Sequence, residues 1–144
     1  MYNNILLAYD GSAAGQQALL NSKDLAQWHD GKLHLLAVMP YDLVALGPEN
    51  VYYNPDDQKA EEERYRAILE AGIAQLKSMG VAATGELVHG DPVDQIIHVA
   101  EKTHADLIVL GHKHRHSWLE RWWRGSISKA LIELAPCSVL VVIT

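Results

Sequence analysis

Hydrophobic residues in this chain fall into short unbroken runs, and between the runs they recur every three or four positions. The runs lie at residues 5–9, 33–38, 107–110 and 138–143, with a weaker, partly alternating run at residues 81–88. A short apolar run is typical of a strand that is buried on both faces, as in a parallel sheet. We therefore predict five strands, of which the third lies nearer an edge.

Each interval between two runs has the pattern and the boundary residues of a helix. We expect the second helix to begin with Asp57 as its N-cap and the third to begin at Asp91 and Pro92. The buried stripe predicted for the fourth helix consists of Ile127, Ala130, Leu131 and Leu134. Strands that alternate with helices predict an α/β fold, a doubly wound, five-stranded parallel sheet with helices on both faces.

In such a sheet ligands bind beyond the carboxyl ends of the strands, where the strand order reverses. If the order is 3-2-1-4-5, the turn at residues 10–12 and the loop that follows Gly111 share one crevice. The long connection at residues 40–57 is either a lid or binding loop or a merely solvated excursion.

Composition narrows the class of protein. The 144 residues, of which 49% are hydrophobic, are expected to form a single domain over residues 1–144. A net charge of -6 argues against nucleic-acid binding. No stretch approaches the ~20 apolar residues of a membrane-spanning helix, and the N-terminus lacks the pattern of a signal peptide. Cys137 is the single cysteine, so neither an internal disulfide nor a cysteine-based metal cluster can form. We expect a cytoplasmic protein that does not contact a membrane.

Three common nucleotide and phosphate sites are excluded by their motifs. The chain contains no G-x-x-x-x-G-K-[ST] and no G-x-G-x-x-G after the first strand, so neither a P-loop nor a dinucleotide fingerprint is present. A receiver domain would need an acidic pair after the first strand and an aspartate at the end of the third. The chain offers Asp10 alone and then His89 and Gly90.

The whole chain resembles the universal stress protein family. The residues that carry the resemblance are ILLAYDGS at 5–12, LHLLAVMP at 33–40, HGDP at 89–92, ADLIVLGHK at 105–113 and GSISKALIELAPCSVLVV at 125–142. The resemblance implies a Rossmann-like, adenine nucleotide α-hydrolase-like fold with strand order 3-2-1-4-5, usually dimeric. One branch of the family binds ATP through Gly, two residues, Gly, nine residues, and Gly followed by Ser or Thr, and another branch has lost this pattern.

By this resemblance the ligand is ATP or AMP, which Mg²⁺ could accompany. The residues that match the family's nucleotide site, together with the two loop histidines beside them, are Ala8, Asp10, Val38, Gly111, His112, His114, Gly125, Ser126, Ile127 and Ser128. The chain departs from the pattern at His114, where the middle glycine should stand, and the loop to Gly125 is one residue longer. A side chain at that position can block the approach of backbone to phosphate.

The same loop carries charge, imidazole and indole groups. Lys113, Arg115, Arg121 and Arg124 outnumber the single acid Glu120, which favours a polyanion. The alternation of His112, His114 and His116 is compatible with zinc or nickel, although imidazole donors beside a phosphate explain it as well. Trp118, Trp122 and Trp123 either fold onto the domain or form a docking surface at residues 118–123 for a protein partner.

The expected function is an ATP- or AMP-binding regulatory or protective module of the stress response. The alternative is a dimeric interaction protein of the same family that does not bind nucleotide. No catalytic residues are predicted, although slow ATP hydrolysis or phosphate transfer stays open. The run at residues 138–143 would form an apolar sheet edge, and we expect a homodimer through it.

Overall fold

The computed structural model describes residues 2–40, 55–113 and 127–144. Its five strands form one parallel sheet in the order β3-β2-β1-β4-β5, which confirms the predicted fold class and strand order. The strands are β1 (Asn4–Ala8), β2 (Lys32–Met39), β3 (Ala83–His89), β4 (Leu107–His112) and β5 (Ser138–Ile143). The helices are α1 (Ala13–His29), α2 (Pro55–Ser78) and α3 (Pro92–Lys102), and residues 127–134 are helical as well.

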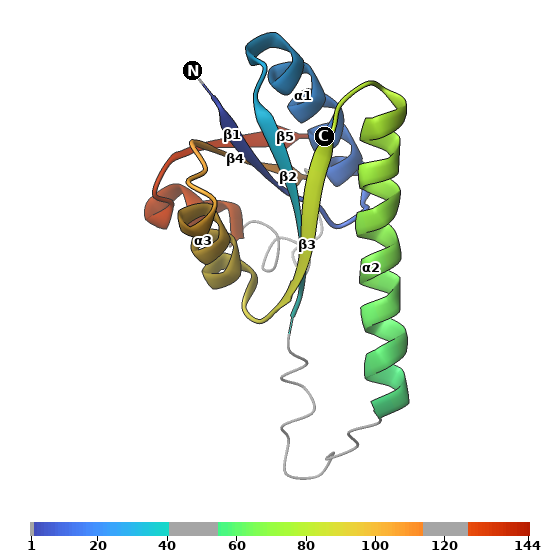
Figure 1. Ribbon diagram of the computed structural model, residues 1–144. Coiled ribbons are helices and arrows are strands. Elements are labelled where there is room, and N and C mark those ends of the chain that lie inside the picture. The colour runs from blue at the N-terminus through green and yellow to red at the C-terminus, as the bar shows by residue number, and fades with distance from the viewer. Residues whose placement is uncertain (1, 41–54, 114–126) are drawn as a thin grey trace.

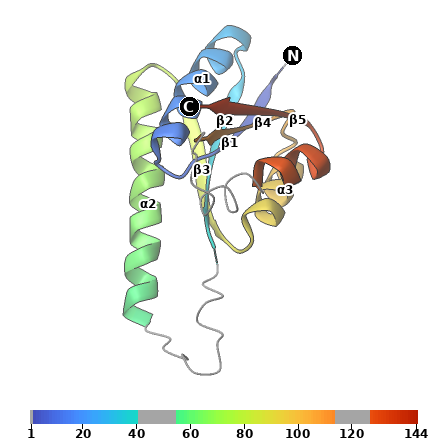
Figure 2. The same ribbon diagram turned by 180° about the vertical axis from the view of Figure 1, so that it is seen from behind.

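Helices cover both faces of the sheet (Figures 1 and 2), as in a doubly wound fold. On one face α1 and α2 pack on alternate strand residues through a core that includes Leu19, Leu35 and Leu76. On the other face α3 and the helical residues 127–134 pack through a second core that includes Val99 and Leu131. Because β1 and β4 lie in the centre and contribute to both cores, their carboxyl ends are held firmly in place.

Polar groups fix where the central strands and the helices begin. The Asp106 carboxylate accepts hydrogen bonds from the backbone N–H groups of Asn3 (2.8 Å) and Asn4 (3.0 Å), which aligns the start of β1 with that of β4. Asp91 caps α3 by accepting from the N–H of Asp94 (3.1 Å), with Pro92 in the first turn, as predicted. The contacts of Asp106 thus fix where β1 and β4 begin relative to each other, and so where their carboxyl ends lie.

Several sequence-based expectations were wrong in detail. Asp57 does not cap α2, because the helix already begins at Pro55 and Asp57 lies in its first turn, where a carboxylate suits the helix dipole. Leu134 does not belong to a buried stripe, since its side chain is 61% exposed. The strands β1 and β3 are shifted by one or two residues from their predicted bounds. Residues 41–54, which hold most of the connection predicted as a lid or a solvated excursion, lie outside the described residues.

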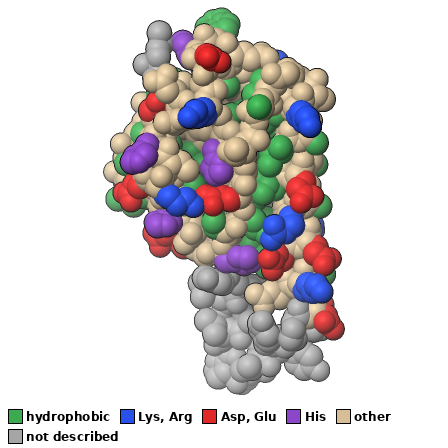
Figure 3. All heavy atoms as spheres, in the orientation of Figure 1, with side chains coloured by type: hydrophobic (Ala, Val, Ile, Leu, Met, Phe, Trp, Pro, Cys, Tyr) green, Lys and Arg blue, Asp and Glu red, His purple; other side chains and the backbone are tan. Residues whose placement is uncertain are grey.

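The charged first half of α2 is a solvated surface, as its composition indicated. Arg64 pairs with Glu61 (2.6 Å) and Arg66 with Glu62 (3.3 Å), and all four side chains are at least a third exposed. Figure 3 shows acidic and basic side chains interspersed along this edge of the molecule. None of the helices among the described residues is both long enough and apolar enough to cross a membrane.

A small charge network joins β2, β3 and α3. Lys102 donates to both carboxylate oxygens of Glu86 (2.9 and 3.0 Å), and the ring of His34 lies between Thr84 and Glu86. Burial alone raises the pKa of the Glu86 carboxyl, but the hydrogen bonds from Lys102 and His34 outweigh it and hold the pKa below its ordinary value of 4.5. The ionised form of Glu86 is therefore favoured by folding.

Replacing Glu86 with Gln should lower the free energy of unfolding at pH 7 by about 0.5–1 kcal/mol. A carboxyl whose pKa is lowered by folding stabilises the protein above its ordinary pKa, and this contribution is lost as the pH falls through the lowered value. The difference between wild type and Glu86→Gln in urea unfolding should thus shrink as the pH falls and disappear once the carboxyl is protonated in both the folded and the unfolded state. The exposed Glu70 of α2 offers the control. A Glu70→Gln difference that equals the Glu86→Gln difference at pH 7 would contradict the assignment.

Candidate functional site

The turn that follows β1 is built by Asp10 and Ser12. The backbone N–H and the hydroxyl of Ser12 both donate to Oδ1 of Asp10 (3.0 and 2.6 Å), and the Ser12 hydroxyl accepts from the N–H of Gly15 (3.0 Å). Ser12 is thereby the N-cap of α1. Gly11 has a φ of 76°, the left-handed region that favours glycine. The cap uses Oδ1 of Asp10, and the residue is exposed.

Gly111 lies against the first turn of α1, backbone to backbone. A Cβ atom at this position would stand 2.2 Å from the carbonyl oxygen of Ala14 and 2.7 Å from the nitrogen of Gly15. No side chain fits into that space, so glycine is required at the end of β4. The close approach of β4 to α1 brings two segments together that lie about a hundred residues apart along the chain.

Strand register sets two of the predicted site residues at one level. Ala8 pairs with Leu36 of β2 and with Leu110 of β4. Two residues further along each chain come Asp10, Val38 and His112. Val38 and His112 therefore stand at one level on the two strands that flank β1, and Asp10 lies in the turn that follows β1, at the carboxyl edge where a parallel sheet of this type binds its ligands.

A partly buried chain of hydrogen bonds links the residue before Asp10 to α1 and α2. The Tyr9 hydroxyl donates to Oε1 of Gln16 (2.6 Å), and the Gln16 amide in turn donates to Gln75 of α2. Burial of the ring, with a smaller effect of the Asp10 charge, raises the pKa of the Tyr9 phenol. The phenol stays protonated at neutral pH and acts as a donor, which ties β1, α1 and α2 together next to Asp10.

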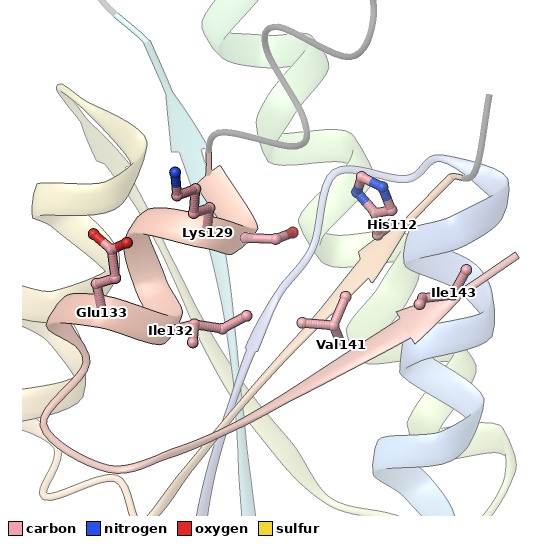
Figure 4. Close-up of a pocket in the computed structure, with 7 residues that line it drawn as sticks. His112, Lys129, Ile132, Glu133, Val141 and Ile143 are labelled. Atoms are coloured by element: carbon pink, nitrogen blue, oxygen red, sulfur yellow. The ribbon is translucent and has the colours of Figure 1, made fainter. Parts of the chain in front are cut away.

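His112 ends β4 and lines an open groove of about 380 Å³ beside the crevice. The residues that line the groove are His112, Ser128, Lys129, Ile132, Glu133, Val141 and Ile143. Figure 4 shows that Ile132 points from the helical residues 127–134 toward Val141 of β5, while Lys129 and Glu133 point away from that strand. Nδ1 of His112 is buried and has no hydrogen-bond partner in the described part of the chain. A buried imidazole nitrogen without a partner is a costly arrangement that a ligand can relieve.

Only some of the other predicted site residues lie among the residues that the structure describes. Ala8 and Val38 are half-buried in β1 and β2, Ile127 packs on the second core and Ser128 is buried and engaged in a contact. The predicted residues that lie outside the described ranges are His114, Gly125 and Ser126. The loop cations from Arg115 to Arg124, His116 and the tryptophans at residues 118–123 lie outside them too. Within the described residues, no group of three His, Cys, Asp or Glu side chains is placed to hold a metal.

Sequence reasoning missed two parts of this site. Ser12 was read as part of a turn rather than as the cap of α1, although a serine after a strand and before a helical pattern is the ordinary signal. Lys129, Ile132 and Glu133 were assigned no role because the groove they line forms between two segments whose spacing only the fold reveals.

Comparisons with known proteins identify the family and agree with the fold. The universal stress protein family matches residues 1–142. A universal stress protein of Methanocaldococcus jannaschii is 28% identical over 142 residues, which are 99% of this chain and 82% of the relative. A solved universal stress protein structure from Burkholderia pseudomallei is 28% identical with a TM-score of 0.76, covering 98% of this chain and 96% of the other. The universal stress protein from Archaeoglobus fulgidus in complex with dAMP shares the fold at 18% identity and a TM-score of 0.70, covering 98% of both chains.

Proposed function

The chain belongs to the universal stress protein family, and from this premise we propose that it binds an adenine nucleotide, AMP or ATP, in the crevice between β1 and β4. It would act as a regulatory or protective module in the stress response, and its site as a binding site rather than a catalytic one. A cytoplasmic location completes the proposal and rests on the family and on the free thiol of Cys137.

The observation that carries the proposal is the meeting of Asp10, Gly111 and His112 at the switch point of the sheet. Oδ2 of Asp10 can accept a hydrogen bond from a ribose hydroxyl, because the cap of α1 uses only Oδ1. Nδ1 of His112 can donate to a phosphate oxygen, which would satisfy a buried atom that has no hydrogen-bond partner among the described residues. A group that can bind ribose and a group that can bind phosphate therefore lie next to each other, which suits a nucleotide.

The neighbouring residues supply the remainder of the site. Val38, half-buried at the end of β2, offers backbone and an apolar surface at the level of Asp10, where an adenine ring can lie. Ser128 brings a hydroxyl to the groove on the side of His112. The dAMP complex of the Archaeoglobus fulgidus protein supports the view that this fold accommodates an adenine nucleotide.

Self-association through β5 belongs to the same proposal. The strand is at the edge of the sheet, and its N–H and C=O groups on the outer side have no neighbouring strand in the described chain. Ile143 and Ile132 beside it are 65% and 66% exposed. An apolar edge of this kind is stabilised by pairing, and two-fold pairing of identical edges gives a closed dimer.

Isothermal titration calorimetry with AMP and with ATP at physiological salt tests nucleotide binding. We expect a saturable heat and a rise in the unfolding temperature, since a ligand at a hundred times its Kd stabilises the folded state by about 2.7 kcal/mol. His112→Ala should weaken binding about tenfold by removing a hydrogen bond to a charged group.

The control is His29→Ala, at the other end of α1 and hence at the opposite edge of the sheet. It should leave the nucleotide affinity unchanged. The absence of both heat and stabilisation in the wild-type protein would refute nucleotide binding, and would favour the dimeric interaction protein instead.

A further inference from the structure

We propose that nucleotide binding and self-association are thermodynamically linked in this protein, because a second copy of the chain closes the groove that contains His112. The inference rests on the proposed nucleotide site and adds to it a regulatory partner, the second copy. The groove is walled by the helical residues 127–134 on one side and by β5 on the other, and it is open along the outer edge of the sheet.

His112 belongs to both regions at once. On its inner side the preceding residue, Gly111, lies against the first turn of α1 and so beside the Asp10 turn. On its outer side His112 pairs with Ile143 in register, and its carbonyl oxygen accepts a hydrogen bond from the N–H of Thr144 (3.0 Å). Any event that fixes the end of β5 therefore fixes His112 as well.

The rim of the groove favours a second copy as its occupant. Lys129 and Glu133 lie one helical turn apart on the exposed side of residues 127–134 (Figure 4). When two sheet edges pair antiparallel about a two-fold axis, the helices over those edges also run antiparallel. In the proposed dimer Lys129 of each copy would pair with Glu133 of the other copy. The rim is thus complementary to itself, while the exposed Ile132 and Ile143 supply apolar surface on both sides.

Nucleotide binding and self-association should favour each other, because the groove is open to solvent in a single copy of the chain. A second copy over β5 excludes water from the outer wall, and an interaction between imidazole and phosphate is stronger in the drier surroundings. A bound phosphate would also give Nδ1 of His112, which is buried and has no hydrogen-bond partner among the described residues, an acceptor. Each event therefore favours the other, and linkage requires that the two effects be equal in free energy.

Sedimentation velocity of the wild-type protein, with and without saturating AMP or ATP, measures the linkage directly. We expect the nucleotide to lower the dimer dissociation constant about tenfold, within the usual range for coupled sites. The variant Ile143→Lys should be monomeric and should bind nucleotide about tenfold more weakly. An added lysine beside the groove would by its charge alone strengthen anion binding, so a weaker affinity reports the loss of association.

Trp28→Lys is the control, since it also replaces an exposed hydrophobic residue with Lys, at an 84% exposed position near the end of α1. It should change neither association nor affinity. Equal nucleotide affinity in wild type and Ile143→Lys, with a dimer constant that nucleotide does not move, would overturn the linkage and leave the nucleotide site standing. A wild-type protein that dimerises but gives no nucleotide heat would overturn the proposed function, and the linkage with it.

Discussion

Replacing Gly111 with Ala is expected to lower the free energy of unfolding by about 3 kcal/mol, at the upper end of the cost of overpacking. The added methyl group would stand 2.2 Å from the carbonyl oxygen of Ala14, and both contacting groups are backbone. Neither can rotate away, so either β4 or the first turn of α1 must move. Urea unfolding followed by far-UV circular dichroism measures the loss, and any residual folded protein should also bind nucleotide more weakly.

The control for this exchange is Gly80→Ala, at the end of α2. Gly80 has a φ of 81° but no heavy atom within 4 Å of a Cβ, so the cost there comes from backbone conformation alone. We expect about 1 kcal/mol. Equal losses for the two variants would mean that the contact between Gly111 and α1 is not tight, and would remove the structural reason for glycine at the end of β4.

Truncating Leu131 to Ala should destabilise the protein by about 2–5 kcal/mol, as is usual for a buried leucine. Its side chain is fully buried and anchors the helical residues 127–134 on the second core. This segment carries Ser128 and one wall of the groove. Thermal and urea unfolding should both report the loss.

Leu134 is the matched control, because it is a second leucine of residues 127–134 but its side chain is exposed. Because it is 61% exposed, Leu134→Ala should change the free energy of unfolding by less than about 0.5 kcal/mol. A Leu134→Ala variant as unstable as Leu131→Ala would show that the side chain is buried in solution. The most direct explanation would then be burial in a contact between two copies, which repeating the comparison with a monomeric Ile143→Lys background would reveal.

The succession of strands and helices along the chain was predictable because its determinants are local, whereas the spatial strand order 3-2-1-4-5 was implied by the family resemblance. Unbroken apolar runs identify strands buried on both faces, and helical periodicity between the runs requires parallel crossovers. The error at Asp57 has a local cause as well, since several polar residues near the start of a helix can serve as its N-cap and the pattern does not choose among them. The error at Leu134 has another cause. A leucine at helical spacing indicates an apolar face, but only the sheet decides how wide the covered part of that face is.

The candidate site was predictable only in part. Asp10, Val38 and Gly111 follow from the rule that ligands bind where the strand order reverses, combined with the family resemblance. The groove could not be foreseen, because its walls are residues 127–134 and β5 and its width depends on how they pack. The steric requirement for glycine at position 111 could not be foreseen either, because only the fold shows that the backbone of α1 leaves no room for a methyl group there.

The hydrogen bonds of Asp106 also bear on the order in which the protein can assemble. They join β4 to Asn3 and Asn4 across sequence separations of 103 and 102 residues. Such distant contacts are slow to form, because the chain between them must be ordered first. The crevice between β1 and β4 therefore does not exist in any partly folded chain that has ordered only its first three strands. A nucleotide in this crevice therefore stabilises only those states in which β1 and β4 have already met.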